Sequence, residues 1–215
     1  MPIEYDEFEF GFSWIAQPLM RTSHALATPE GVWLIDPVDD PEPLARAAAL
    51  GAPAGVLQLL DRHKRDCAPI AGRLGVPHLV VPDAVPASPF SFIPVVRRPG
   101  WRESALWWAE RRTLVVPEAL GTTEHFTLGR APVGVHPVIR LLPPTALRGY
   151  EPEHLLVGHG KGVHGPDATA GLEHALETSR RGAPEGLARM AGMLVGQALS
   201  LVGQATSRAT RSRAR

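Results

Sequence analysis

The chain has 215 residues, of which 44% are hydrophobic and 20% charged, with one cysteine and a formal net charge of zero. This length and balance indicate one soluble domain with a sizeable core, and they argue against nucleic acid or an anionic membrane as a partner. A single cysteine excludes an internal disulfide and a cysteine-cluster zinc site. The acidic N-terminal residues lack the basic and apolar regions of a signal peptide. We therefore expect a cytoplasmic protein, and the arginine-, alanine-, glycine- and proline-rich composition suggests a bacterial source.

The first half of the chain alternates between strand and helix signals. A turn at 28–31, with proline early and glycine late, joins the two strands of a hairpin that ends at Asp36. Asp39 or Asp40 is predicted to cap the helix that follows. The expected elements are an edge strand over 7–16, the hairpin over 22–36, a helix over 41–50, a strand over 55–60, a helix over 67–75 and a strand over 78–81. This order predicts parallel strands joined by crossover helices.

The second half begins with a proline-rich stretch and then returns to strands. The expected strands are 92–96, 104–108, 113–116 and 155–157, with loop and short helical pieces over 121–150. Asp167 is predicted to cap a helix over 168–181. A final helix is expected over 184–206, because apolar residues there fall on one helical stripe.

Three strand ends carry residues suited to chemistry. The strand 55–60 leads into the run Asp61-Arg62-His63-Lys64-Arg65-Asp66, and the strand 155–157 leads into Gly158-His159-Gly160. Glu118 follows the strand 113–116 in the same way. Loops at strand ends expose side chains while the sheet holds them in place, so these loops are the candidates for a functional site.

The order of these segments resembles the metallo-β-lactamase fold superfamily over about residues 8–180. The matching segments are Ile35-Asp36-Pro37, the charged run in place of the His-x-His-x-Asp-His metal motif, Arg97-Arg98-Pro99-Gly100 in place of His-Thr-Pro-Gly, Val115-Val116-Pro117-Glu118 in place of a strand ending in Gly-Asp, and Val157-Gly158-His159-Gly160. The resemblance implies an α+β fold, an αββα sandwich in which two mixed β-sheets lie between helices, here with an added C-terminal helix. Members of this family hydrolyse lactams, thioesters, phosphodiesters and lactones.

The resemblance carries over to individual residues unevenly. His63 and His159 match histidines of the family's metal site. Asp61 replaces the first histidine of the motif, Asp66 replaces the third, and Glu118 replaces the bridging aspartate. These five residues are the candidates for a catalytic role.

Cations stand where the family places other metal ligands. Arg65 replaces the aspartate that normally holds the second metal, and Arg97 replaces the mid-chain histidine. A guanidinium cannot ligate a metal, so a dinuclear zinc site is not expected. We expect Arg65, Arg97 and Lys64 to supply positive charge in place of the metal, balancing carboxylates that the fold would bring together, namely Asp36, Asp61, Asp66 and Glu118. On this first hypothesis no metal cofactor binds.

The alternative is one zinc or other divalent ion held by Asp61, His63, Glu118 and His159, because zinc accepts imidazole nitrogen and carboxylate oxygen. Geometry separates the two hypotheses. If these four side chains converge, the mononuclear site is favoured, whereas Arg65 or Arg97 at the centre would favour the metal-free site.

Function follows the same division. The first hypothesis is a protein with a degenerate metal site that binds or scaffolds an unknown small molecule or protein. The second is an atypical mononuclear hydrolase of an ester, thioester or phosphodiester. The expected organisation is a domain over 1–183, an amphipathic helix over 184–207 and a disordered basic tail over 208–215. The helix is expected to dock on the domain or to form a homodimer through 187–205, with membrane contact the minority reading.

Overall fold

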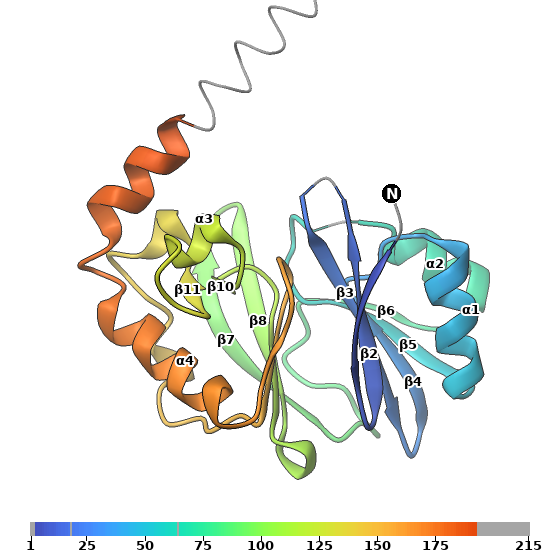
Figure 1. The fold of residues 1–215 in the computed structure, drawn as a ribbon. Coiled ribbons are helices and arrows are strands. Elements are labelled where there is room, and N and C mark those ends of the chain that lie inside the picture. The colour runs from blue at the N-terminus through green and yellow to red at the C-terminus, as the bar shows by residue number, and fades with distance from the viewer. Residues whose placement is uncertain (1–2, 18, 64, 193–215) are drawn as a thin grey trace, which may run out of the picture.

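Two β-sheets pack face to face, and helices cover the outer face of each sheet (Figure 1). The computed structural model describes residues 3–17, 19–63 and 65–192. The α+β sandwich with two mixed sheets between helices, predicted from the sequence, is therefore confirmed.

The first sheet has six strands in the order β1-β2-β3-β4-β5-β6. The strands are β1 (Glu4–Phe8), β2 (Gly11–Ala16), β3 (Arg21–Thr28), β4 (Gly31–Ile35), β5 (Pro53–Gln58) and β6 (His78–Val80). Neighbours from β1 to β4 are antiparallel, whereas β4, β5 and β6 are parallel. The crossovers are α1 (Pro41–Leu50) and α2 (Cys67–Leu74), as the strand-helix-strand order predicted.

The second sheet has five strands in the order β13-β12-β9-β8-β7, and β10 and β11 form a separate small sheet. The strands are β7 (Phe90–Arg98), β8 (Trp101–Trp108), β9 (Thr113–Val116), β10 (Leu120–Gly121), β11 (Gly134–Val135), β12 (His154–Val157) and β13 (Val163–His164). The helices are α3 (Glu124–Thr127), α4 (Pro166–Thr178) and three 3₁₀ turns at Ala109–Arg111, Pro137–Ile139 and Thr145–Leu147. Strands β9 and β12 are parallel, so their carboxyl ends meet at one edge of the sheet.

Apolar residues on both faces of the central strands build three layers of core. In β9, Leu114 and Val116 pack toward the α4 side, whereas Val115 lies between the two sheets. In β4, Trp33 lies between the sheets and Leu34 packs with residues of α1 and α2. Side chains alternate along a strand, so an uninterrupted apolar run is what a sheet covered on both faces requires.

The helix N-caps predicted from the sequence were correct for α1 and wrong for α4. Asp40 caps α1 by accepting a hydrogen bond from the Glu42 backbone N–H, as predicted. Asp167 does not cap α4, because Pro166 already starts the helix and Gly165 holds the N-cap position. A further helix begins at 183 and runs to 192, and the rest of the predicted helix and the basic tail lie outside the described residues. None of the described helices is long and apolar enough to cross a membrane.

His24 lies fully inside the first sheet, where its Nδ1 is 2.8 Å from the Ser13 hydroxyl. Burial and the charge of Arg65 lower the pKa of His24 to about 3. Below about pH 6.5 the His24 imidazole binds a proton in the unfolded chain but stays neutral in the folded chain. Lowering the pH therefore favours the unfolded chain, and the folded protein loses stability. We expect the stability advantage of the wild type over a His24→Gln variant to shrink by about 1.4 kcal/mol per pH unit between pH 6 and pH 4. Urea unfolding of both proteins across this range measures it, and a constant difference would contradict it.

Candidate functional site

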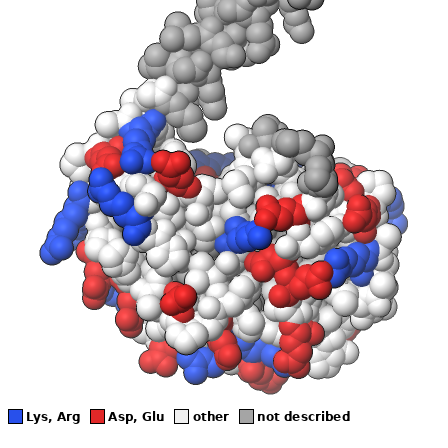
Figure 2. Space-filling view, in the orientation of Figure 1, with Lys and Arg blue, Asp and Glu red and all other residues white. Residues whose placement is uncertain are grey.

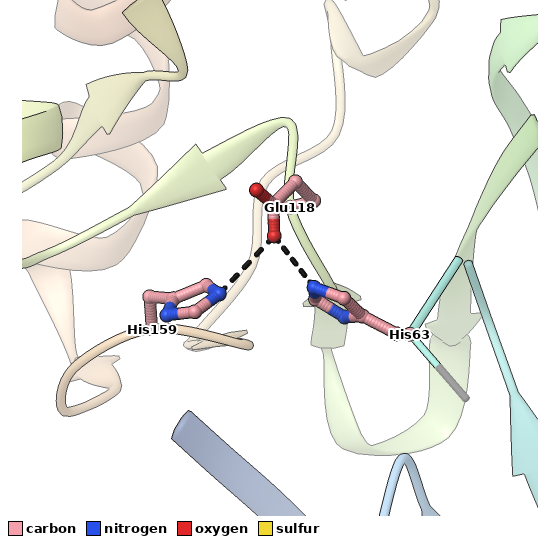
Figure 3. Close-up of side chains that lie close together, drawn as sticks. All are labelled: His63, Glu118 and His159. Carbon is pink, nitrogen blue, oxygen red and sulfur yellow. Dashed lines mark hydrogen bonds and ion pairs between the residues drawn. The ribbon is translucent and has the colours of Figure 1, made fainter. Parts of the chain in front are cut away.

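Three loops meet at one edge of the second sheet, and each contributes one side chain to a cluster. His63 comes from the loop after β5, Glu118 from the loop after β9, and His159 from the loop after β12. In Figure 3 the two imidazoles approach the Glu118 carboxylate from opposite sides. The sequence therefore placed these three residues correctly at strand ends, and the fold brings the strand ends together.

Close packing of two backbones fixes the loops after β9 and β12. A side chain at Gly158 would place its Cβ 2.0 Å from the Pro117 carbonyl oxygen, so only glycine fits there. On the other side, the Thr22 backbone N–H donates to the Gly158 carbonyl oxygen at 2.8 Å. His159 is thereby held between the first sheet and the loop that carries Glu118.

The loop that carries His63 is fixed by hydrogen bonds to neighbouring strands. The Gln58 amide donates to the carbonyl oxygens of Leu60 and Asp61, at 2.9 and 3.1 Å. The Asp61 backbone N–H donates to the Arg102 carbonyl oxygen at 3.0 Å. These bonds tie the start of the loop to both sheets, so the position of His63 is set by the sandwich.

Three imidazoles surround the Glu118 carboxylate. The Nε2 atoms of His63 and His159 lie 2.7 and 3.1 Å from Oε2, and Nε2 of His136 lies 3.3 Å from Oε1. Burial by itself raises the pKa of Glu118, but the neighbouring imidazoles of His136, His159 and His63 outweigh burial and hold the pKa well below its usual range. The side chain of Glu118 is 12% exposed.

Tautomers distinguish the three histidines. A carbonyl only accepts, so His159 donates from Nδ1 to the Leu19 carbonyl oxygen at 3.1 Å, and in its neutral form Nε2 carries a lone pair. His136 accepts the Val138 backbone N–H at Nδ1, so its Nε2 carries the proton and donates to Glu118. His159 therefore has the tautomer of a metal ligand, whereas His136 has that of a group that orients the carboxylate.

The cluster has the donor set that a divalent ion requires. Ligand atoms of His63, Glu118 and His159 all lie within 4.8 Å of one another. The lone pair of neutral His159 Nε2 faces a carboxylate oxygen, and the buried Nδ1 of His63 has no hydrogen-bond partner among the described residues. A lone pair facing a carboxylate oxygen is unfavourable, and a cation between the two atoms would make it favourable. Two imidazoles and one carboxylate therefore fit a zinc-type ion.

This geometry corrects the sequence-based expectation that no metal cofactor binds. That expectation assumed that cations would fill the centre between the carboxylates. The structure instead keeps three metal-type ligands in mutual reach, and the arginine of the motif lies beside them with its guanidinium turned to backbone carbonyls. The absence of a metal cofactor is therefore contradicted by the cluster itself.

Burial keeps one of the ligands free of protons. The pKa of His63 is lowered to about 4, first by burial and then by the charges of Arg65 and His159, against the attraction of Glu118. His63 is therefore neutral across the physiological range, as a metal ligand must be. The His63 and His159 side chains are 15% and 17% exposed, so the cluster is open to solvent on one side.

The two aspartates of the charged loop lie outside this cluster. Asp61 has a buried Oδ1 atom with no hydrogen-bond partner among the described residues. Asp66 precedes α2 and accepts the Asp39 backbone N–H at 2.8 Å, which ties that helix to the loop before α1. Lys64, predicted to supply positive charge, lies outside the described residues.

Arg65 lies beside the cluster, half-buried as a residue and with its Nε atom fully buried. Its guanidinium donates to the carbonyl oxygens of Thr22, Asp36 and Gly158, the last two at 2.9 and 3.0 Å. Asp36 lies next to it, and burial raises the pKa of that carboxyl to about 7 although Arg65 opposes the rise. Glu118 acts on both groups through its charge. Arg65 thus acts through its charge on Asp36 as well as on His63 and Glu118 of the cluster.

Arg97 has a different set of partners. Its guanidinium donates to the Asp83 carboxylate at 3.2 Å and to the Glu103 carbonyl oxygen at 2.8 Å. A third bond goes to the Ser104 hydroxyl at 3.1 Å. All of these contacts are made along the hairpin of β7 and β8 and to the loop before it, so Arg97 stabilises that hairpin.

Sequence reasoning missed His136 and Glu103. His136 lies in the irregular stretch before Pro137, where no periodic pattern marks it. Glu103 is fully buried in β8 and accepts hydrogen bonds from the backbone N–H groups of Glu118 and Ala119 and from Trp101 Nε1, at 3.0, 2.8 and 2.7 Å. A lone carboxylate inside an apolar strand was the available signal for it.

Glu103 holds the loop that aims Glu118 at the histidines. A Glu103→Gln variant keeps the shape but turns an amide N–H toward donors, so we expect it to cost about 1–3 kcal/mol of stability. Glu103 orients a metal ligand without being one, so the Glu103→Gln change should also weaken zinc affinity about 10–100-fold. Urea unfolding and competition with a zinc-binding dye measure both. Trp101→Phe, which removes only one of the three donors, is the matched control, and equal effects of the two changes would contradict the assignment.

Comparison with solved structures finds metallo-β-lactamases that match most of this chain. The metallo-β-lactamase from Pontibacter korlensis matches with a TM-score of 0.56 and 12% identity over 83% of this chain and 99% of that one. The enzyme from Hirschia baltica gives 0.55 and 8% over 84% and 97%, and FIM-1 of Pseudomonas aeruginosa, solved in its mono-zinc form, gives 0.53 and 10% over 86% and 96%. No protein-family model and no curated protein matches the chain. The chain thus has the metallo-β-lactamase fold that the order of its motifs predicted.

Proposed function

We propose that this protein is a hydrolase that uses a single divalent metal ion held by His63, Glu118 and His159. The mutual reach of these three ligand atoms, within 4.8 Å, is the observation on which this rests. A divalent ion held in this way supplies Lewis acidity at neutral pH, which suits hydrolysis of an ester, thioester or phosphodiester.

The surrounding residues have defined tasks in this proposal. His136 donates to Oε1 of Glu118 and so leaves Oε2, the oxygen shared by His63 and His159, for the ion. Arg65 supplies a positive charge beside the cluster: its guanidinium donates to the backbone carbonyl oxygen of Asp36, and its charge lowers the pKa of the Asp36 carboxyl against the effect of burial. With this charge in place, the site is proposed to hold one metal ion rather than two.

Arg62 is suited to attract an anionic substrate to the same site. Its guanidinium lies 3.9 Å from Oε1 of Glu118 and 4.0 Å above the ring centroid of Trp101, and its side chain is 43% exposed. Stacking on the indole restricts the guanidinium without burying it. An exposed cation at the rim of a site steers anions toward it.

Activity assays on the zinc-loaded protein test the function. We expect hydrolysis of at least one of a p-nitrophenyl ester, an acyl thioester and bis-p-nitrophenyl phosphate, with loss of that activity in a Glu118→Gln variant. Arg62→Ala is expected to raise KM for the phosphodiester more than for the neutral ester. If the metal-loaded protein turns over none of the three, the binding or scaffold role predicted from the sequence is favoured.

A further inference from the structure

A cavity lies outside the ligand cluster, between α4 and the segment that joins α3 to β11. It has a volume of about 330 Å³, the size of a pocket for a small molecule. The space-filling view shows basic side chains, together with some acidic ones, at the end of the molecule where α4 passes into the next helix (Figure 2). The described residues that line the cavity are Phe126, Thr127, Leu128, Arg130, Ala131, Val133, Gly134, Val135, Arg140, His174, Ala175, Thr178, Arg181 and Gly182.

The lining is strongly cationic. It contains Arg130, Arg140 and Arg181 together with His174, and among these described lining residues none is acidic. The guanidinium fork matches the geometry of phosphate and carboxylate oxygens. A concave surface of one charge sign concentrates ligands of the opposite sign.

Arg140 is the most informative of these side chains, because it is buried without a counter-ion. Only 5% of it is exposed, and it donates from Nη2 to the Phe126 carbonyl oxygen. No carboxylate among the described residues lies within ion-pair distance, and Nε has no partner there. A buried guanidinium without a balancing anion is costly to the fold, so a bound anion would compensate it.

The backbone makes room for this guanidinium. A Cβ at Gly182 would lie 2.4 Å from Nη1 of Arg140, and a Cβ at Gly186 would lie 3.0 Å from its Nε. Gly182 directly precedes the helix that begins at 183, and Gly186 lies within its first turn. The guanidinium of Arg140 therefore packs directly against the backbone at the start of this helix.

The nearest acid is already in use. Glu185 pairs with Arg130 at 2.8 Å and with Arg189 at 2.9 Å. Arg181 is exposed and makes no hydrogen bond or ion pair with the part of the chain that the structure describes. Glu185 acts on Arg140 through its charge from beyond ion-pair distance, and neither Arg140 nor Arg181 forms an ion pair with a described carboxylate.

We propose that this cavity binds a small molecule through its phosphate group. Two unbalanced guanidinium groups exceed the charge of one carboxylate but match a phosphate, which carries about −1.5 to −2 near neutral pH. The volume exceeds that of a bare phosphate, which leaves room for a small organic part contacting Val133 and Ala175. Phe126 separates this cavity from the ligand cluster, since it lines the cavity and its ring stacks on His159 with centroids 5.8 Å apart.

Titration calorimetry with inorganic phosphate at low ionic strength tests this site. We expect saturable binding to the wild-type protein and about tenfold weaker binding to Arg181→Ala, through loss of a charge-assisted hydrogen bond. Arg98→Ala removes an exposed arginine of β7 and should leave the affinity unchanged. Arg140→Lys, which keeps the charge but loses the fork, should also bind more weakly.

The opposite results are equally clear. The phosphate site is refuted if the wild-type protein shows no saturable binding, or if Arg181→Ala binds phosphate as the wild type does. An equal loss in Arg98→Ala would indicate attraction by overall charge only. Arg181 is exposed, so its variant decides the question even if Arg140→Lys does not fold.

Discussion

Replacing both His63 and His159 by alanine is expected to weaken zinc binding by more than about 100-fold, beyond the effect of losing an outer-shell partner. These imidazoles supply two of the three ligand atoms of the cluster, and Glu118 alone cannot complete a zinc site. Competition with a zinc-binding dye measures the affinity at pH 7.

His174→Ala is the matched control, because His174 is an exposed histidine on α4. It should bind zinc as the wild type does. The double variant should remain folded by circular dichroism, since the hydrogen bonds that hold these loops do not involve the two imidazoles, apart from one from His159 to the Leu19 carbonyl oxygen. Zinc binding that survives the double replacement would show that the ion sits elsewhere.

Replacing Arg65 by methionine is expected to reduce the free energy of unfolding by about 3 kcal/mol. The change removes a buried guanidinium that bridges the carbonyl oxygens of Thr22, Asp36 and Gly158. Arg62→Met is the control, since the Arg62 side chain is 43% exposed and its ion pair is long, and a cost below about 1 kcal/mol is expected.

The pH dependence of this loss tests whether Arg65 acts as a charge. Burial raises the pKa of Asp36 to about 7 even with Arg65 beside it, and without Arg65 that pKa rises further. Below the pKa of about 7 the Asp36 carboxyl is neutral and needs no cation beside it. Above that pKa it is a buried carboxylate, which destabilises the fold unless a cation lies near it. The deficit of Arg65→Met should therefore be smaller at pH 5 than at pH 8. A pH-independent deficit would assign Arg65 to hydrogen bonding alone.

The sandwich could be predicted because its strands and turns are encoded locally. The hairpin of β3 and β4 follows from the turn at 28–31, and the parallel order of β4, β5 and β6 follows from two intervening helical patterns. Asp167 failed as a cap because Pro166 can occupy the first helical position, so the helix starts earlier. Local signals gave most of the elements, but the single edge strand expected over 7–16 is the hairpin of β1 and β2, and the short strands β10, β11 and β13 were not expected.

The site was predictable only where residues follow regular strands. His63, Glu118 and His159 each follow a strand, so the resemblance places them at one edge. His136 reaches the same carboxylate from an irregular segment, and its position depends on tertiary packing. The direction of the Arg65 side chain depends on the approach of Thr22 and Gly158, which are distant in sequence. These long-range contacts have no local signature.

The metal content of the wild-type protein tests the central claim most directly. Purified protein is stripped with a chelator, reloaded with excess zinc, desalted and measured by plasma mass spectrometry against protein concentration. Three converging ligands and a half-buried arginine beside them predict one zinc ion per chain. A value near zero would mean that the histidines only hold Glu118 in place, and a value near two would mean that Arg65 does not replace a second cation.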